Sequence, residues 1–227
     1  MQSTILEQLV INNDSKIVFL VMDGVGGLAK EDKGGTELQV ANTPNLDALA
    51  AKSSCGMFDP VYPAITPGSG PGHFGLFGYD PLTSNIGRGV LAAAGIGFKL
   101  TEKDVAARIN FATSDADGNV TDRRAGRIGN DENQRVCERL RQGIDLKDHG
   151  VEMFIETVKE HRAAVIFRGD NLCGDLEDTD PQKTGIPPKT PKATSPDGER
   201  MIPIVTTFIE HAQKILADEP KVNTVLL

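Results

Sequence analysis

A nearly unbroken apolar run at residues 16–22, followed at once by Asp23 and Gly24, is the feature that most limits what this chain can fold into. Such a run is typical of a strand that is buried on both faces of a mostly parallel sheet. Sheets of that kind alternate strands with helices and carry reactive side chains just past the carboxyl ends of their strands. The run therefore predicts an α/β fold. Asp23 is then either a functional carboxylate or a cap of the loop that follows the strand.

Besides a helix that is predicted to start at Ser69, after the proline-rich residues 60–67, two helices are predicted downstream of this strand. The first begins at Thr43 and Pro44, which form a threonine N-cap with proline at the first helical position. The second covers residues 90–94 and is bounded by glycines. The buried stripe of the first helix is expected to consist of Leu46, Leu49 and Ala50.

From about residue 100 the pattern changes to alternating strands and turns, which predicts a second domain of the α+β type. Residues 117–119 have the composition of a hairpin turn between two strands. The predicted strands are 107–112, 120–124, 151–157, 163–168 and 222–227, and the predicted helices are 130–141 and 202–217.

The stretch from Gly169 to Gly198 is rich in Pro, Asp, Thr and Lys and is predicted to be a long loop. A loop of this length inside a domain is either functional or disordered. Asp178, Thr179 and Asp180 within it are a lid, a binding edge or a turn beside a proline, and the sequence leaves these roles open.

The charge of the chain argues against some classes of partner. A net charge of -8 over 227 residues, with an isoelectric point near 5.0, disfavours binding to nucleic acid or to an anionic membrane, although a basic pocket can exist in an acidic protein. No apolar run approaches the roughly 20 residues of a membrane span. Single cysteines without paired spacing indicate a cytoplasmic protein with reduced, structural thiols at Cys55, Cys137 and Cys173.

The glycine-rich segment at residues 66–73 presents a serine, Ser69, between two glycines. Glycine neighbours let the backbone approach a ligand and leave the hydroxyl uncovered. At a helix start, Ser69 would face free N–H groups that suit a phosphoryl group or a developing alkoxide. The other interpretation, a serine that only caps the helix, stays open, because no G-x-S-x-G turn accompanies it and His73 is the only imidazole nearby.

Several segments together resemble the archaeal-type 2,3-bisphosphoglycerate-independent phosphoglycerate mutases. The combination covers almost the whole chain and is specific, although each piece alone is weak. The segments are IVFLVMDGVG at 17–26, TPNLDALA at 43–50, TPGSGPGHFGLFGYDP at 66–81, GRGVLAAAG at 87–95 and TDRRAGRI at 121–128, together with residues 161–162 and 178–181.

The resemblance implies an activity and a catalytic group. The expected reaction interconverts 3-phosphoglycerate and 2-phosphoglycerate through a phosphoserine at Ser69. Two divalent ions, manganese or magnesium, are implied, with Asp23 and Ser69 among their ligands; such ions lower the pKa of a hydroxyl and hold the transferring phosphoryl group. The implied domains are the first part of an alkaline-phosphatase-like core at 1–98, an inserted α+β substrate domain at 99–218, and the start of a return strand at 219–227.

An arginine cluster after the hairpin turn is the natural candidate for binding phosphate and carboxylate, because a guanidinium group donates two hydrogen bonds to either. On the residues alone, a solvated hairpin rim is the simpler interpretation. The resemblance favours a pocket instead and adds two residues from the next strand pair. The predicted substrate-binding residues are Asp122, Arg123, Arg124, Arg127, His161 and Arg162.

The further aspartate and histidine ligands that the resemblance requires have no counterpart in this sequence. Asp145 and His149 have ligand-like spacing, but glycines bracket them within a connection, and we reject them. Because one carboxylate and one hydroxyl cannot build a two-ion site, the chain by itself is expected to lack mutase activity and to bind manganese weakly.

Other functions stay open at this point. Asp23 and Ser69 set the chemistry and not the substrate, so another metal-dependent phosphotransferase or phosphatase of the same superfamily is one alternative. An inactive fragment that acts only as a binding module is the other. Besides phosphoglycerate, the expected partners are a second copy of the chain or a complementing C-terminal polypeptide.

Overall fold

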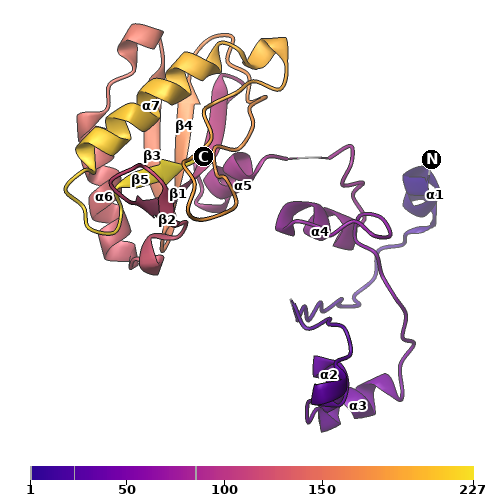
Figure 1. Cartoon of the computed structure of the whole chain (residues 1–227). Helices are drawn as coiled ribbons and strands as arrows, with labels where there is room; N and C mark the ends of the chain where they lie inside the picture. Colours follow the sequence, from indigo (N-terminus) through magenta and orange to yellow (C-terminus); the bar gives the residue numbers. More distant parts are fainter. Residues whose placement is uncertain (1, 23, 85) are drawn as a thin grey trace. The chain divides into compact units, whose positions relative to one another are not determined.

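The computed structural model describes residues 2–22, 24–84 and 86–227 (Figure 1). The chain divides into two compact units, Met1–Phe58 and Asp59–Leu227. The described residues form a mixed α/β structure with an antiparallel sheet. The domain limits expected at residues 98 and 218 stay predictions.

The first unit consists of short helices joined by extended chain. The strand expected at residues 16–22 is wrong, since these residues form no strand and the side chains of Ile17 and Val18 are 83% and 86% exposed. A strand needs neighbours that accept its hydrogen bonds and cover its faces, and the sheet formed by the described residues does not include this segment. Asp23 lies outside the described residues. The helices of this unit are α1 (Gln2–Leu9), the 3-10 helix η1 (Glu31–Lys33), α2 (Glu37–Val40) and α3 (Pro44–Ala50).

The helix predicted at Thr43 and Pro44 is confirmed as α3, with Thr43 at the N-cap. Its expected buried stripe is wrong, because no residue of α3 is buried. Leu49 and Ala50 are exposed and Leu46 is only partly buried. An apolar stripe becomes a core only when another layer packs on it, and no described residue of this unit is buried.

The second unit is an antiparallel sheet with helices on both faces. Its strand order is β2-β1-β4-β3, and β5 also pairs with β1. The elements predicted between residues 90 and 217 are confirmed, with differences only at their ends. The strands are β1 (Asp104–Ser114), β2 (Val120–Asp122), β3 (Glu152–Lys159), β4 (Arg162–Arg168) and β5 (Thr224–Leu226). The helices are α4 (Ser69–Leu76), α5 (Arg88–Gly95), α6 (Asn130–Gly143) and α7 (Met201–Ile215), with 3-10 helices η2 (Ala125–Arg127), η3 (Lys147–His149) and η4 (Pro196–Gly198).

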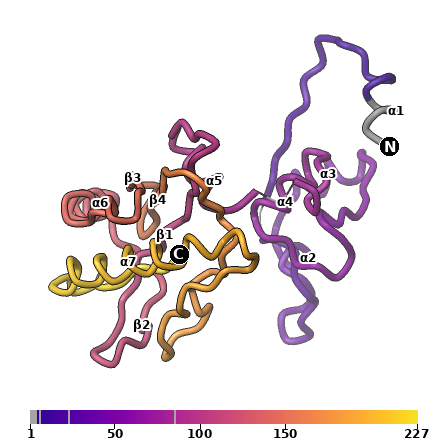
Figure 2. Tube along the Cα trace, turned by 90° about the horizontal axis from the view of Figure 1, so that it is seen from above, coloured from indigo at the N-terminus to yellow at the C-terminus, as the bar shows by residue number. Residues whose placement is uncertain are grey.

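Alternate residues of β1 point to opposite faces of the sheet, and the apolar set builds the main core. Ile109 and Phe111 are fully buried there among residues of α6 and α7, two helices that lie beside each other (Figures 1 and 2). Phe167 of β4 meets Phe208 of α7 edge to face, with ring centres 5.6 Å apart. The part of this face around Ile109 and Phe111 is therefore closed to ligands.

Helix α5 covers part of the opposite face. Ala93 packs against Ala164 and Ile166 of β4. Gly89 lies so close to β1 that an added Cβ would stand 1.9 Å from the carbonyl oxygen of Ala106, which only glycine avoids. Beyond this contact the same face of β1 carries polar side chains.

The last strand belongs to the antiparallel sheet, and its expected role as the start of a return strand stays a prediction. Residues 219–227 are predicted to start a strand that returns to the first domain. In the structure, β5 pairs with β1 of the antiparallel sheet, with Val225 opposite Phe111. Val225 is also buried in the main core, so packing and ladder hydrogen bonds both hold the strand there.

Two expectations from composition can be compared with the structure. The three cysteines are free: Cys55 is exposed, Cys137 is buried and Cys173 is intermediate. Burial raises the pKa of the Cys137 thiol to about 11. Among the described residues, no helix has the length and apolar character needed to cross a membrane.

Candidate functional site

A cavity of 560 Å³ lies along β1 and is lined by residues of both faces of this strand. The starts of α4 and α5 contribute Gly68–Pro71 and Ile86–Gly89 to its lining, and the long loop contributes Leu176–Asp180. Arg108 and Asn110 come from β1 itself. The cavity therefore gathers two of the segments that the sequence singled out, the serine loop and the long loop, around one strand.

Ser69 lies at a helix start, as predicted. Gly68 is the N-cap and Ser69 is the first residue of α4, so the interpretation of Ser69 as the cap itself is wrong. Nδ1 of His73 lies 2.6 Å from the carbonyl oxygen of Ser69, which engages this nitrogen with the backbone and not with the hydroxyl. The N–H groups of a first helical turn have no partner within the helix, which suits an anionic group bound at Ser69.

Arg108 is a partly buried cation in the wall of the cavity. Burial lowers the pKa of Arg108, and the nearby positive charges of Arg88 and Arg162 lower it further, against the opposite effect of Asp178 and Asp180. Arg108 forms no ion pair with any residue that the structure describes. A partly buried cation that two aspartates influence but that forms no direct ion pair with a described residue still has unmet hydrogen-bonding capacity, so this position favours the binding of an anion.

Asn110 adds a polar atom that lacks a partner. Its side-chain Oδ1 is buried and accepts no hydrogen bond from the described residues. Asn110 lies two positions after Arg108 on the same face of β1 and opposite Arg162 of β4. Because an unsatisfied buried acceptor costs free energy, a hydroxyl group of a bound molecule would be stabilised beside it.

The long loop predicted at residues 169–198 is confirmed and forms one wall of the cavity. Asp180 is buried, and its two oxygens accept hydrogen bonds from Nε and Nη2 of Arg123, both at 2.7 Å. Asp178 lines the cavity directly. Of the roles that the sequence left open for residues 178–180, a binding edge agrees best with this position.

The hairpin residues Asp122, Arg123 and Arg124 have three different surroundings. The Asp122 carboxylate accepts hydrogen bonds from the backbone amides of Arg124 at 2.8 Å and Gly126 at 2.7 Å, which closes the turn after β2. Arg123 is engaged with Asp180. The side chain of Arg124 is exposed. None of the three lines the cavity, and their contact with substrate stays a prediction.

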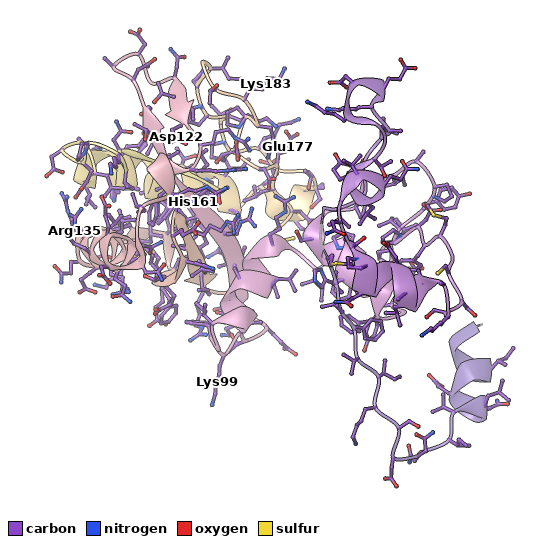
Figure 3. All side chains as sticks on the ribbon, turned by 90° about the horizontal axis from the view of Figure 1, so that it is seen from below. Lys99, Asp122, Arg135, His161, Glu177 and Lys183 are labelled. Atoms are coloured by element: carbon purple, nitrogen blue, oxygen red, sulfur yellow. The ribbon has the colours of Figure 1, made fainter. Side chains whose placement is uncertain are left out.

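His161 is buried at the turn between β3 and β4 (Figure 3). Its Nδ1 has no hydrogen-bond partner among the described residues and lies 3.9 Å from Oε2 of Glu160. Burial lowers the pKa of His161, as do the positive charges of Arg162 and Arg127, so the ring is neutral at pH 7. Arg127 itself pairs with Glu160 at 3.3 Å. The structure thus brings these predicted residues close to one another, outside the lining of the cavity, and among them the charge of Arg162 acts on Arg108.

Three residues of the cavity escaped the sequence reasoning as binding groups: Arg88, Arg108 and Asn110. A signal for two of them was present. The alternation of residues 107–112 puts Arg108 and Asn110 on the face opposite Ile109, so a charged residue on that face could have been connected with the arginine cluster. Arg88 stood inside a recognised motif, at the start of a predicted helix.

The described residues do not fit a two-ion centre by themselves. No three carboxylate, imidazole or thiol side chains among them are grouped as a metal ion requires. Asp23 lies outside the described residues. Asp145 accepts a hydrogen bond within its own turn, and Nε2 of His149 lies 3.0 Å from Oγ1 of Thr207, which agrees with their rejection as ligands.

Comparison with known proteins extends these observations. A probable 2,3-bisphosphoglycerate-independent phosphoglycerate mutase of Thermus thermophilus is 49% identical over 222 residues, which are 98% of this chain and 54% of the relative. The corresponding protein of Deinococcus radiodurans is 49% identical over 221 residues, 96% of this chain and 54% of the relative. The chain thus spans about half the length of the curated relatives it matches.

Two solved structures are similar in fold. The cofactor-independent phosphoglycerate mutase from Thermoplasma acidophilum matches with a TM-score of 0.56 and 33% identity, over 91% of this chain and 57% of that one. The PH0037 protein from Pyrococcus horikoshii matches with a TM-score of 0.64 over 90% of this chain and 48% of that one, and at 24% identity it supports the fold alone. The family model described as 2,3-bisphosphoglycerate-independent phosphoglycerate mutase matches residues 50–223. The chain therefore belongs to the 2,3-bisphosphoglycerate-independent phosphoglycerate mutase family.

Proposed function

We propose that the cavity on β1 is a phosphoglycerate site and that the chain takes part in the interconversion of 3-phosphoglycerate and 2-phosphoglycerate. The observation that carries the proposal is Arg108, a partly buried cation that forms no direct ion pair with any described residue, in the same cavity as Ser69. A phosphate ester that also carries a carboxylate supplies the missing negative charge. The names of the relatives support the same reaction.

In the proposed reaction, Ser69 carries the phosphoryl group between two oxygens of glycerate. Its Oγ forms a bond to phosphorus as the bond from phosphorus to the 3-oxygen breaks; the serine proton is released and the 3-oxygen becomes a hydroxyl. The 2-hydroxyl then attacks the phosphoserine, loses its proton and frees Ser69. Between the two steps the glycerate must turn within the site while its carboxylate stays bound.

The polar residues of the cavity suit this turning. Arg108 and Arg88 supply positive charge for phosphate and carboxylate, and Arg162 adds charge beside them. The buried Oδ1 of Asn110 is an acceptor for whichever glycerate hydroxyl is free. We propose these four residues as the substrate-binding set, with Arg124, Arg127 and His161 at its border.

The ions and the larger core belong to the same proposal. Two divalent ions, manganese or magnesium, would activate the Ser69 hydroxyl, with Asp23 among their ligands. The described residues do not fit such a centre by themselves, and a complementing polypeptide is proposed as the source of the other ligands. An alkaline-phosphatase-like core and a cytoplasmic location are proposed with them, on the family resemblance and the free thiols.

Calorimetric titration of the 227-residue chain with 3-phosphoglycerate tests the proposal. We expect saturable binding that weakens at least tenfold in Arg108→Met, because the variant removes the unpaired charge and keeps most of the side-chain volume. Lys99→Met is the matched control, since it removes a positive charge outside the cavity lining. Absence of saturable binding to the unmodified chain, or equal loss in both variants, would overturn the proposal.

A further inference from the structure

The long loop between β4 and η4 has no regular secondary structure, yet its middle is fastened at several points. Its one β-bridge joins Leu176 to Ala193. The segment Leu176–Asp180, which lines the cavity, is buried at Thr179 and Asp180. Pro181 is buried too, although Asp178 and Gln182 on either side of these three residues are exposed. Figure 3 marks the loop by Glu177 and Lys183. Such local order in an irregular segment needs specific contacts, because fixing each residue costs conformational entropy.

The first contact is the ion pair between Arg123 and Asp180. Arg123 donates through Nε and Nη2 to both carboxylate oxygens at 2.7 Å, the two-point geometry that is specific to arginine. Nη2 also donates to Oε1 of Gln182 at 2.6 Å, and the amide of Gln182 donates to Asp180 at 2.9 Å. Burial acts to raise the pKa of Asp180, but these hydrogen bonds outweigh it and the pKa is lowered. The carboxylate is therefore charged and fully engaged.

The second contact joins the loop to the end of the chain. The amide of Thr179 donates to the carbonyl of Leu227 at 2.7 Å, and the amide of Leu227 donates to Oγ1 of Thr179 at 2.9 Å. The third contact joins the loop to β2, through hydrogen bonds of Val120 with Gly185 and Ile186 at 2.8 and 2.9 Å. Of these three contacts, only the ion pair with Asp180 depends on a long side chain. That side chain, Arg123, is one of the residues that the sequence predicts to bind substrate.

The direction of the Arg123 side chain is set by its own backbone. It follows β2 immediately, and Asp122 closes the turn behind it through the amides of Arg124 and Gly126. The side chain of Arg123 is mostly buried, with 27% of it exposed, beside an Asp180 side chain that is 6% exposed. An arginine held this way has no free edge of its guanidinium for a second two-point contact with phosphate.

We propose that Arg123 is a positioning residue: it acts through Asp180 to hold residues 176–182 as a closed wall of the cavity and does not itself bind phosphoglycerate. The inference rests on the proposed function in that it takes the cavity as the phosphoglycerate site. The proposal gives the two arginines different roles: Arg108 binds the anion, and Arg123 holds the loop that forms one wall of the cavity.

Hydrogen exchange of the full chain without any ligand tests whether Arg123 holds residues 176–182 in place. Arg123→Met and Asp180→Asn should raise amide exchange across residues 176–182 about tenfold or more, because the opened loop becomes the main state. Arg123→Lys should give an intermediate increase, since lysine keeps the charge and loses the two-point geometry. Arg124→Met, a change at the exposed neighbour, is the control and should leave exchange unchanged. Protection of β4 in each variant shows that the sheet remains folded, and the isosteric Asp180→Asn covers the case in which Arg123→Met unfolds.

Titration of the same variants with inorganic phosphate and with 3-phosphoglycerate tests whether Arg123 affects binding only through the position of this loop. If the closed loop falls to about a tenth of the population, the apparent affinity should fall about tenfold. Weaker binding with unchanged loop exchange would make Arg123 a direct ligand and overturn the proposal, as would a loop that opens with no loss of affinity. If the unmodified chain binds neither probe, the proposed function fails and the wall role falls with it, while the exchange experiment still decides whether Arg123 holds the loop.

Discussion

Gly89 of α5 lies against the carbonyl group of Ala106 in β1, at a distance that leaves no room for a side chain. The contact joins two backbones and therefore does not depend on any rotamer. It fixes where α5 begins, and with it the place of Arg88 at the cavity. One glycine thus connects the packing of the sheet with the charge of the site.

Replacement of Gly89 by alanine should lower the free energy of unfolding by about 1–3 kcal/mol, because the new methyl group must push α5 away from β1. Urea denaturation followed by circular dichroism measures the change. Gly95 in the same helix is the control: a Cβ there meets nothing within 4 Å, so Gly95→Ala should be neutral or stabilising by up to about 1 kcal/mol. Equal losses in both variants would contradict the close contact.

Replacing Glu219 should destabilise the second unit more than replacing its neighbour Asp218. Its side chain is 7% exposed and accepts hydrogen bonds from Arg135 and Arg139 of α6. Glu219→Gln should cost about 2 kcal/mol, since charge-assisted hydrogen bonds are weakened at a buried position. Asp218→Asn, which alters an exposed partner of Arg139, should cost less than about 1 kcal/mol in the same denaturation experiment. The reverse order would refute this assignment.

Stability should fall on acidification because of His161. Burial and the charges of Arg162 and Arg127 hold its pKa below the usual value of 6.5 in the folded chain. Below pH 6.5 the unfolded state then binds the additional proton, so folding loses up to about 1 kcal/mol between pH 7.5 and 5.5. Denaturation at the two pH values should show a smaller loss in His161→Phe than in the unmodified chain. An identical loss would show that other groups cause it.

The thiols should differ in reactivity. Burial raises the pKa of Cys137 to about 11, two units above its usual 9.0, which lowers its thiolate fraction about a hundredfold. Burial also keeps reagents away from the sulfur atom. At pH 8 we expect a disulfide reagent to modify the exposed Cys55 rapidly and Cys137 only after unfolding. Peptide mass spectrometry distinguishes the two sites. Early labelling of Cys137 would mean that the core around α6 opens easily.

Manganese should bind this chain weakly. No group of three metal-binding side chains exists among the described residues, so we expect a dissociation constant weaker than about 1 mM in calorimetry and no conversion of 3-phosphoglycerate. Phosphorus NMR of the reaction mixture measures the conversion directly. Tight one-to-one manganese binding, or turnover by the pure chain, would show that the metal site is completed in some other way.

The second unit could be predicted well because each of its helices and strands is defined by residues that lie close together in the sequence. The alternation of β1, the turn before β2 and the amphipathic pattern of α6 are all local signals. The apolar run at 16–22 is an equally clear local signal that failed. A buried-strand pattern becomes a strand only beside other strands, and the sheet of the described residues does not include this segment.

The site was predictable in the same uneven way. Ser69 was placed at a helix start from glycine and proline neighbours alone. The role of Arg123 could not be predicted from its neighbours in the sequence, because its partner Asp180 is 57 positions away. No local pattern indicates that these two residues form an ion pair. Arg108 was missed since one arginine on the polar face of a strand usually faces solvent, and only the tertiary structure shows it partly buried beside other cations.

The uncovered apolar run at residues 17–22 also determines how the chain behaves at high concentration. Ile17 and Leu20 are 83% and 78% exposed, and the six-residue run contains no charge and no proline. Short β-prone segments of this kind in different molecules stack into cross-β assemblies. The net charge of -8 keeps molecules apart at neutral pH and vanishes near pH 5.0, so colloidal stability is lowest there and highest in mildly alkaline, low-salt buffer.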